Sequence, residues 1–164
     1  MSRIHSFPPI AAPDARILIL GSMPGTASLA ARQYYAHPRN LFWTILGAAL
    51  GEPLAQLPYE ERTAALIRHQ IALWDVLHSC ERTGSLDSAI KPATQIANDI
   101  AGFFQAHPAI VKVLFNGGLA ETAYRRHTAG LPTPPGERLP STSPAHAALD
   151  FASKLIRWQA ALSL

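Results

Sequence analysis

The sequence contains a single cysteine, Cys80, among its 164 residues. One thiol cannot form a disulfide within the chain, and it cannot supply the four thiolates of an iron–sulfur cluster. The seven histidines show no His-x-x-x-His spacing, and there is no Cys-x-x-Cys pair, so the spacings typical of a zinc site are missing. The sequence therefore predicts no disulfide, no bound metal and no cofactor.

Long apolar runs are missing as well. No run approaches the roughly 20 residues that a transmembrane helix needs. Residues 1–6 lack the apolar core of a secretory signal peptide. We therefore expect a cytoplasmic protein that does not enter a membrane.

Charged residues are sparse, at 15%, while hydrophobic residues make up 48% of the chain. This balance is typical of a folded protein rather than a disordered one. The length fits one domain, residues 1–164, with a full core, and we expect a monomer. The net charge of +3 comes from dispersed Lys and Arg residues, so it gives only modest support to a polyanionic partner.

Apolar runs and helical patterns alternate along the chain. Strands are expected at 16–20, 71–76, 111–115 and 137–139, and helices at 40–50, 60–69, 98–106, 119–126 and 147–162. Asn98 is expected to cap the third of these helices. The order predicts an α/β fold of three α/β/α layers around a central, roughly four-stranded parallel sheet.

Polar or glycine residues follow each of the four expected strands, namely Gly21, Asp75, Asn116 and Ser141. The carboxyl ends of parallel strands meet at one edge of a sheet, which is where open α/β folds place ligands. We therefore expect these four segments to form a single pocket.

Three stretches of the sequence together resemble one known family. They are Gly-Ser-Met-Pro-Gly at 21–25 with Tyr-Tyr-Ala-His-Pro-Arg-Asn-Leu-Phe-Trp at 34–43, then Leu-Trp-Asp-Val-Leu at 73–77 with Gly-Ser-Leu-Asp at 84–87, and Leu-Pro-Ser-Thr-Ser-Pro at 139–144. They resemble the uracil-DNA glycosylase superfamily, and within it the hypoxanthine-DNA (deoxyinosine) glycosylase branch. The order of expected elements agrees with this fold across nearly the whole chain.

Two residues depart from the pattern of many superfamily members. Met23 stands where many members have the Asp or Asn that positions the attacking water, and Leu139 stands where many have a His or Asn that stabilises the departing base. Neither a thioether nor an isobutyl group can do this work. The resemblance therefore favours the hypoxanthine branch, in which the working Asn lies in the His-Pro-x-Asn segment, here Asn40.

The resemblance implies a monofunctional DNA glycosylase that flips a deaminated base out of DNA and hydrolyses its N-glycosidic bond in base excision repair. Asn40 would then position the water, although it could equally cap the following helix. Tyr35 would stack on the base or merely pack on the core rim, while Phe42 and Trp43 are expected to point into the core.

The remaining base contacts are expected from the first turn and from the third strand end. Gly21, Ser22, Met23 and Gly25 would surround the base and offer it backbone N–H groups, and Asn116 would read the base edge or tie down the neighbouring loop. Asp75 is expected to hold loops, and Asp87 is left open between loop and base.

DNA itself is the expected partner. The residues predicted to contact it are His37, Arg39, Ser141, Thr142 and Ser143, with Arg82 and Lys91 as further candidates for phosphate contact. The sequence does not identify the side chain that would wedge into the duplex.

Other functions stay open at this point. One is a uracil or thymine mismatch glycosylase, which Met23 and Leu139 disfavour, and another is a catalytically inactive DNA-binding relative. A serine hydrolase built on Ser22 and His146 is disfavoured, because Ser22 lacks the Gly-x-Ser-x-Gly context of a nucleophile elbow. No lysine occupies a motif position, so Schiff-base lyase chemistry is not expected.

Overall fold

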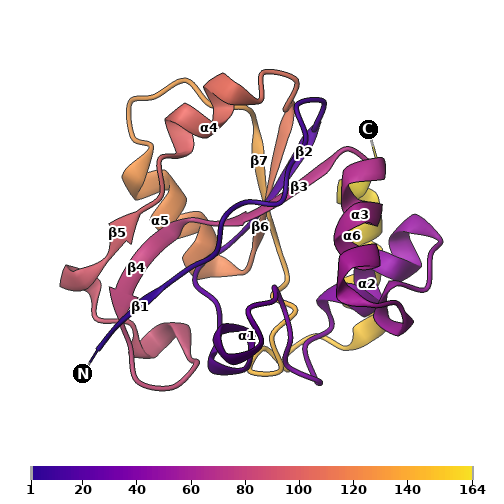
Figure 1. Cartoon of the computed structure of the whole chain (residues 1–164), viewed down its shortest axis with the longest axis horizontal. Helices are drawn as coiled ribbons and strands as arrows, with labels where there is room; N and C mark the ends of the chain where they lie inside the picture. The colour runs from indigo at the N-terminus through magenta and orange to yellow at the C-terminus, as the bar shows by residue number, and fades with distance from the viewer. Residues whose placement is uncertain (1, 164) are drawn as a thin grey trace.

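A four-stranded parallel sheet forms the centre of the computed structural model, which describes residues 2–163 (Figure 1). Its strand order is β3-β2-β6-β7. The strands are β2 (Ile17–Gly21), β3 (Ile71–Asp75), β6 (Lys112–Asn116) and β7 (Gly136–Leu139). All pairs are parallel, with Gly21 opposite Asp75 and Asn116 opposite Leu139. The four strands predicted from the apolar runs are therefore confirmed, in one sheet.

Helices cover both faces of this sheet (Figure 1). The six α-helices are α1 (Thr26–Ala31), α2 (Phe42–Leu50), α3 (Tyr59–Arg68), α4 (Ile100–Ala106), α5 (Gly118–His127) and α6 (Phe151–Leu162). Along β2, Ile17 and Ile19 pack in the core cluster that includes α2, α3 and α6 residues, whereas Leu18 and Leu20 pack in the cluster that includes α4 and α5 residues. Because both faces of β2 are covered, the whole strand is buried, as central parallel strands are.

The predicted helices are present with shifted starts. The helix expected at 98–106 begins at Ile100, and Asp99 rather than Asn98 caps it, accepting a hydrogen bond from the Gly102 N–H at 3.0 Å. The side chain of Asn98 instead donates to the Asp75 carbonyl at 2.8 Å. The helix expected from residue 147 begins at Phe151, capped by Asp150.

A second sheet was not predicted. It is antiparallel, with β4 (Leu77–Glu81) between β1 (Arg3–His5) and β5 (Ile96–Ala97). These strands are short, and Arg3 pairs with Glu81 across the length of half the chain. Strands this short, paired over so long a sequence separation, show no alternation of apolar and polar residues from which they could be predicted. Three 3₁₀ turns, at Leu54–Gln56, Asp87–Ala89 and Pro92–Thr94, complete the structure.

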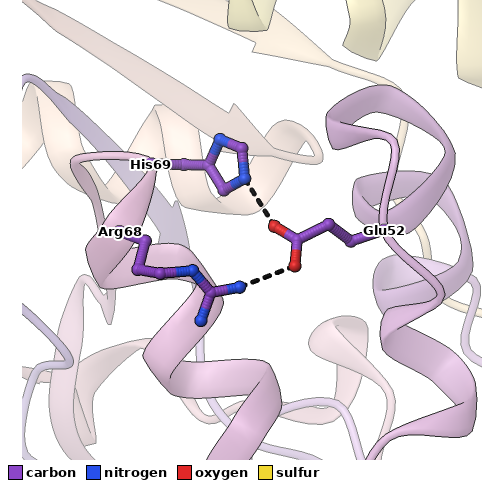
Figure 2. A network of polar contacts seen from close by, with 3 residues as sticks. All are labelled: Glu52, Arg68 and His69. Carbon is purple, nitrogen blue, oxygen red and sulfur yellow. Dashed lines mark hydrogen bonds and ion pairs between the residues drawn. The ribbon is translucent and has the colours of Figure 1, made fainter.

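A polar cluster at the surface joins the ends of α2 and α3 (Figure 2). The Glu52 carboxylate lies 2.6 Å from the Arg68 guanidinium and 2.6 Å from the His69 ring. Pairing with His69 and Arg68 lowers the pKa of Glu52. The cluster thus ties the turn after α2 to the end of α3.

None of the helices within residues 2–163 is long and apolar enough to cross a membrane.

Candidate functional site

A pocket of about 330 Å³ opens at the carboxyl edge of the parallel sheet. All four strand-end residues, Gly21, Asp75, Asn116 and Ser141, line it, which confirms the expected convergence. The turn after β2, the start of α1, part of the 34–40 segment, the 85–87 loop and the 141–146 loop complete the wall. The volume lies within the usual range of small-ligand pockets.

The structure brings nearly all the predicted site residues to this pocket. Those that line it are Gly21, Ser22, Met23, Gly25, Tyr35, His37, Asn40, Asn116, Ser141, Thr142 and Ser143. Arg39 does not line it and is exposed, with its backbone N–H donating to His37 Nδ1 at 3.1 Å. The roles of these residues remain predictions.

One part of the pocket wall is built around Gly21. A Cβ atom at this position would lie 2.5 Å from Asp75 Oδ1 and 2.9 Å from the Tyr35 hydroxyl. Such distances are too short for non-bonded atoms, so only glycine allows the two polar groups to approach the end of β2. Asp75 Oδ2 and the Tyr35 hydroxyl are both buried without a hydrogen-bond partner among the described residues.

Tyr35 adopts a left-handed backbone, with φ of 56°. This conformation costs a non-glycine residue free energy, and surrounding contacts must hold it in place. One such contact is Phe42, whose ring stacks on Tyr35 at 4.1 Å between centroids and 18° between planes. Phe42 and Trp43 are themselves buried, as predicted. Burial and then the charge of Asp75 raise the pKa of Tyr35, so its hydroxyl is a proton donor at neutral pH.

Asp75 is 4% exposed, and its carboxyl group lies among other titratable groups. Burial, and to a smaller extent the charge of Asp87, raise its pKa to about 7 against the opposing effect of Arg82. Tyr34 and Tyr35 also lie within its electrostatic range. The pocket therefore holds a carboxyl group whose protonation changes near neutral pH, whereas the sequence favoured a structural role for Asp75 over contact with the base.

We expect Asp75→Asn to stabilise the protein more at about pH 8.5 than at about pH 4.5. A raised native pKa means that unfolding releases the Asp75 proton between about pH 4 and 7. The wild-type free energy of unfolding therefore falls as pH rises through that window, by about 4 kcal/mol for a shift of this size. Asparagine cannot ionise and removes this loss.

Thermal unfolding of both proteins across this pH range checks the prediction. Asp14→Asn, which changes an exposed carboxylate that accepts from Gln70, is the matched control. Identical pH dependence in wild type and Asp75→Asn would contradict it.

Asn40 directly precedes Leu41, the N-cap residue of α2, so it is not itself the N-cap residue that its sequence context suggested. Its side-chain Oδ1 accepts a hydrogen bond from the Phe42 N–H at 2.9 Å, at the start of α2. The same side chain lines the pocket, and its amide N–H₂ group has no acceptor among residues 2–163. The contact with the Phe42 N–H thus fixes the residue while its amide donors stay free for a bound group.

Asn116 ties the end of β6 to the loop after β7. Its Nδ2 donates to Thr142 Oγ1 at 3.0 Å, and its Oδ1 accepts from the Thr142 N–H at 2.9 Å. Thr142 is fully buried, and its carbonyl accepts from the Leu41 N–H at 3.0 Å. Of the two alternatives left open for Asn116, the loop contact is the one observed. Thr142 accordingly acts as a junction between three segments of the pocket wall.

The turn after β2 is hydrogen bonded to the 84–87 loop. Ser22 Oγ donates to Asp87 Oδ1 at 2.8 Å, although Asp87 as a whole residue is exposed. Burial of its carboxylate raises the pKa of Asp87, and the Ser22 hydrogen bond and Arg82 lower it. Because the Ser22 proton is directed at a carboxylate, Ser22 is not paired with His146, which lines the same pocket. The Met23 N–H has no acceptor within residues 2–163, so it is available to a ligand oxygen.

Arg82 is not available to DNA, so its prediction as a phosphate contact is wrong. The residue is 4% exposed, and its guanidinium donates to the carbonyls of Pro24 at 2.6 Å and Gly84 at 2.7 Å. Arginine is usually exposed, and only the tertiary structure reveals this burial. Lys91 is exposed and lies 3.9 Å from Glu81.

Histidine, cysteine and acidic side chains do not gather around a metal position in the part of the chain that the structure describes. No group of three or more of them lies close enough to hold an ion.

Comparison with known proteins gives consistent results. The family model of the Uracil DNA glycosylase superfamily matches residues 8–161. Curated proteins named hypoxanthine DNA glycosylase, from Methanosarcina barkeri and Methanosarcina acetivorans, are 42% and 39% identical over 113 residues, which is 69% of this chain and 70% of each relative.

A solution NMR structure of a Methanosarcina acetivorans protein, provisionally assigned as a uracil DNA glycosylase, has the same fold. Its TM-score is 0.82 at 32% identity, over 98% of this chain and 97% of the other. The predicted α/β fold is therefore confirmed by an independent structure.

Proposed function

The chain belongs to the uracil DNA glycosylase superfamily and is a DNA glycosylase, and we propose that the base it removes is hypoxanthine. Two relatives of at least 39% identity carry the name hypoxanthine DNA glycosylase. Two residues also favour this base over uracil. Met23 is buried and apolar where many superfamily members position water, and Leu139 is 1% exposed and does not line the pocket.

The observation that carries the proposal is the position of Asn40. Asn40 lines the same pocket as Tyr35 and the β2 turn, so its amide group would hold water beside a base bound there. Glycosidic cleavage gives the sugar oxocarbenium character and places negative charge on the departing base. A positioned water and hydrogen-bond donors facing the base both lower the energy of that state.

We assign the other roles from the contacts of each residue. The free Met23 N–H would donate to an oxygen or nitrogen of the base, and Tyr35 would stack on it or donate from its hydroxyl. His37, Ser141 and Ser143, at the opening, would contact flanking phosphates, and exposed Arg39 would do so outside the pocket. The three lysines, Lys91, Lys112 and Lys154, do not line the pocket, which supports hydrolysis without a lyase step.

DNA is the substrate of a glycosylase of this family. We further propose that the DNA carries a deaminated base and that one domain, residues 1–164, acts as a cytoplasmic monomer without a cofactor. The proposal on the base is the part with the most direct test.

The test is excision from four labelled duplexes, which contain a single hypoxanthine, uracil, thymine mismatch or xanthine. Alkali converts each abasic site into a strand break that a gel can count. The fastest single-turnover excision is expected at hypoxanthine. Excision of uracil alone would assign the protein to the mismatch group, and binding without any excision would identify an inactive relative. Glu52→Gln, in the surface cluster of Figure 2, is the matched control and should excise as wild type does.

A further inference from the structure

The loop at residues 84–87 is held rigidly beside the pocket. Ser85 Oγ accepts from the Thr26 N–H at 2.9 Å, at the start of α1. Asp87 accepts from Ser22 at 2.8 Å, and buried Arg82 donates to both Gly84 and the turn after β2. Contacts on both sides of residue 86 therefore fix the backbone of this loop against the base pocket.

Leu86, between these contacts, is 55% exposed and lines the pocket. Among the described residues that line it, Leu86 is the one large apolar side chain that is exposed; Met23 and Tyr34 are buried, and Tyr35 is half-buried. Exposed Pro144 and Ala145 on the 141–146 loop are small. Figure 1 shows the segment after β4 and the segment after β7 at the same edge of the molecule, with α1 between them.

A base that leaves the duplex breaks its stacking contacts and leaves a gap. Proteins that unstack DNA commonly fill such a gap with a Leu, Phe, Ile, Met or Pro side chain, which offsets part of the lost stacking. The side chain must be apolar, next to the site that receives the base, and mounted on backbone that does not yield. Leu86 meets all three conditions.

We propose that Leu86 enters the gap that the extruded nucleotide leaves and thereby stabilises the flipped state. The inference rests on the DNA glycosylase activity and adds a positioning residue to it. Leu86 acts through the DNA stack and not on the glycosidic bond. Removal of its side chain should therefore lower the rate of excision from duplex DNA, where base stacking must be broken, and not from a single strand.

We expect Leu86→Ala to lower single-turnover excision of hypoxanthine from duplex DNA by about 10- to 100-fold, the equivalent of losing one buried leucine side chain. Excision of hypoxanthine from a single strand should stay within about twofold of wild type. In a third substrate, a bulky pyrene nucleotide lies opposite the hypoxanthine. The pyrene itself fills the gap in the duplex, so it should restore the excision rate of Leu86→Ala. Leu131→Ala, another exposed leucine in the loop that follows α5, is the control and should match wild type on all three substrates.

Three results would overturn the inference. The first is an equal loss on duplex and single strand, which would indicate a damaged pocket. The second is an unchanged duplex rate. The third is a duplex-specific loss that appears instead in Leu149→Ala, at an exposed leucine just before α6. Lack of excision by wild type on every substrate would instead refute the proposed function, so the two failures are distinguishable.

Discussion

Asn40→Ala is expected to lower the rate constant for hypoxanthine excision by about 10²- to 10³-fold, the usual cost of removing one positioned polar group from a transition state. The variant also loses the Oδ1 contact with the Phe42 N–H, the first backbone N–H group of α2. Losing a side-chain partner at a helix start costs about 1 kcal/mol of stability. Single-turnover kinetics on the hypoxanthine duplex measure the first effect, and thermal unfolding measures the second.

Two further variants separate catalysis from the contact at the helix start. Asn40→Ser keeps an oxygen for the Phe42 N–H but removes the amide, so it should be as stable as wild type and as slow as Asn40→Ala. Asp99→Ala removes a comparable cap, from the start of α4, and should leave excision unchanged. Wild-type excision by Asn40→Ser would contradict the catalytic role and leave Asn40 with the helix-start contact alone.

Gly21→Ala is expected to reduce both stability and excision. The added Cβ would meet Asp75 Oδ1 at 2.5 Å and the Tyr35 hydroxyl at 2.9 Å, so one of the two buried groups must move. Overpacking of this kind costs about 1–3 kcal/mol, and a chain of this length loses about 2–4 °C of melting temperature for each kcal/mol. Thermal unfolding and single-turnover excision measured on the same preparation test both effects.

Gly25→Ala is the matched control for stability. Its Cβ would lie 3.4 Å from Ser85 Oγ, an ordinary contact, and its φ of −73° suits any residue. We expect its unfolding free energy to stay within about 1 kcal/mol of wild type. Wild-type stability and activity in Gly21→Ala would show that Asp75 and Tyr35 do not need to lie where they do.

Sequence patterns were sufficient for the parallel sheet and its edge. The runs at β2, β3 and β6 are apolar because both faces of these strands are covered, and that requirement is local to each strand. Glycine and polar residues follow directly at Gly21, Asp75 and Asn116, so the position of the pocket could be predicted from the strand ends. The resemblance supplied Asn40, which no periodicity would have singled out.

The contacts among distant residues could not be predicted in this way. Arginine is usually found at the surface, yet Arg82 is buried and its guanidinium donates to the carbonyls of Pro24 and Gly84. The small sheet depends on pairing between Arg3 and Glu81, and no local period reports that pairing. Nothing in the local sequence distinguishes Leu86 from other leucines. The contacts of Ser85 and Asp87 in the folded chain place it beside the pocket.

Short segments of the sequence were enough to predict the fold class and the edge of the sheet that carries the pocket, because buried strands are continuously apolar and polar residues or glycine follow each strand end. The resemblance added the candidate residues in the 34–43 segment. The protonation of Asp75, the need for glycine at position 21 and the exposure of Leu86 could be read only from the folded chain. Each of these depends on atoms that the chain brings together from distant segments, and the electrostatic and steric terms act through distance in space.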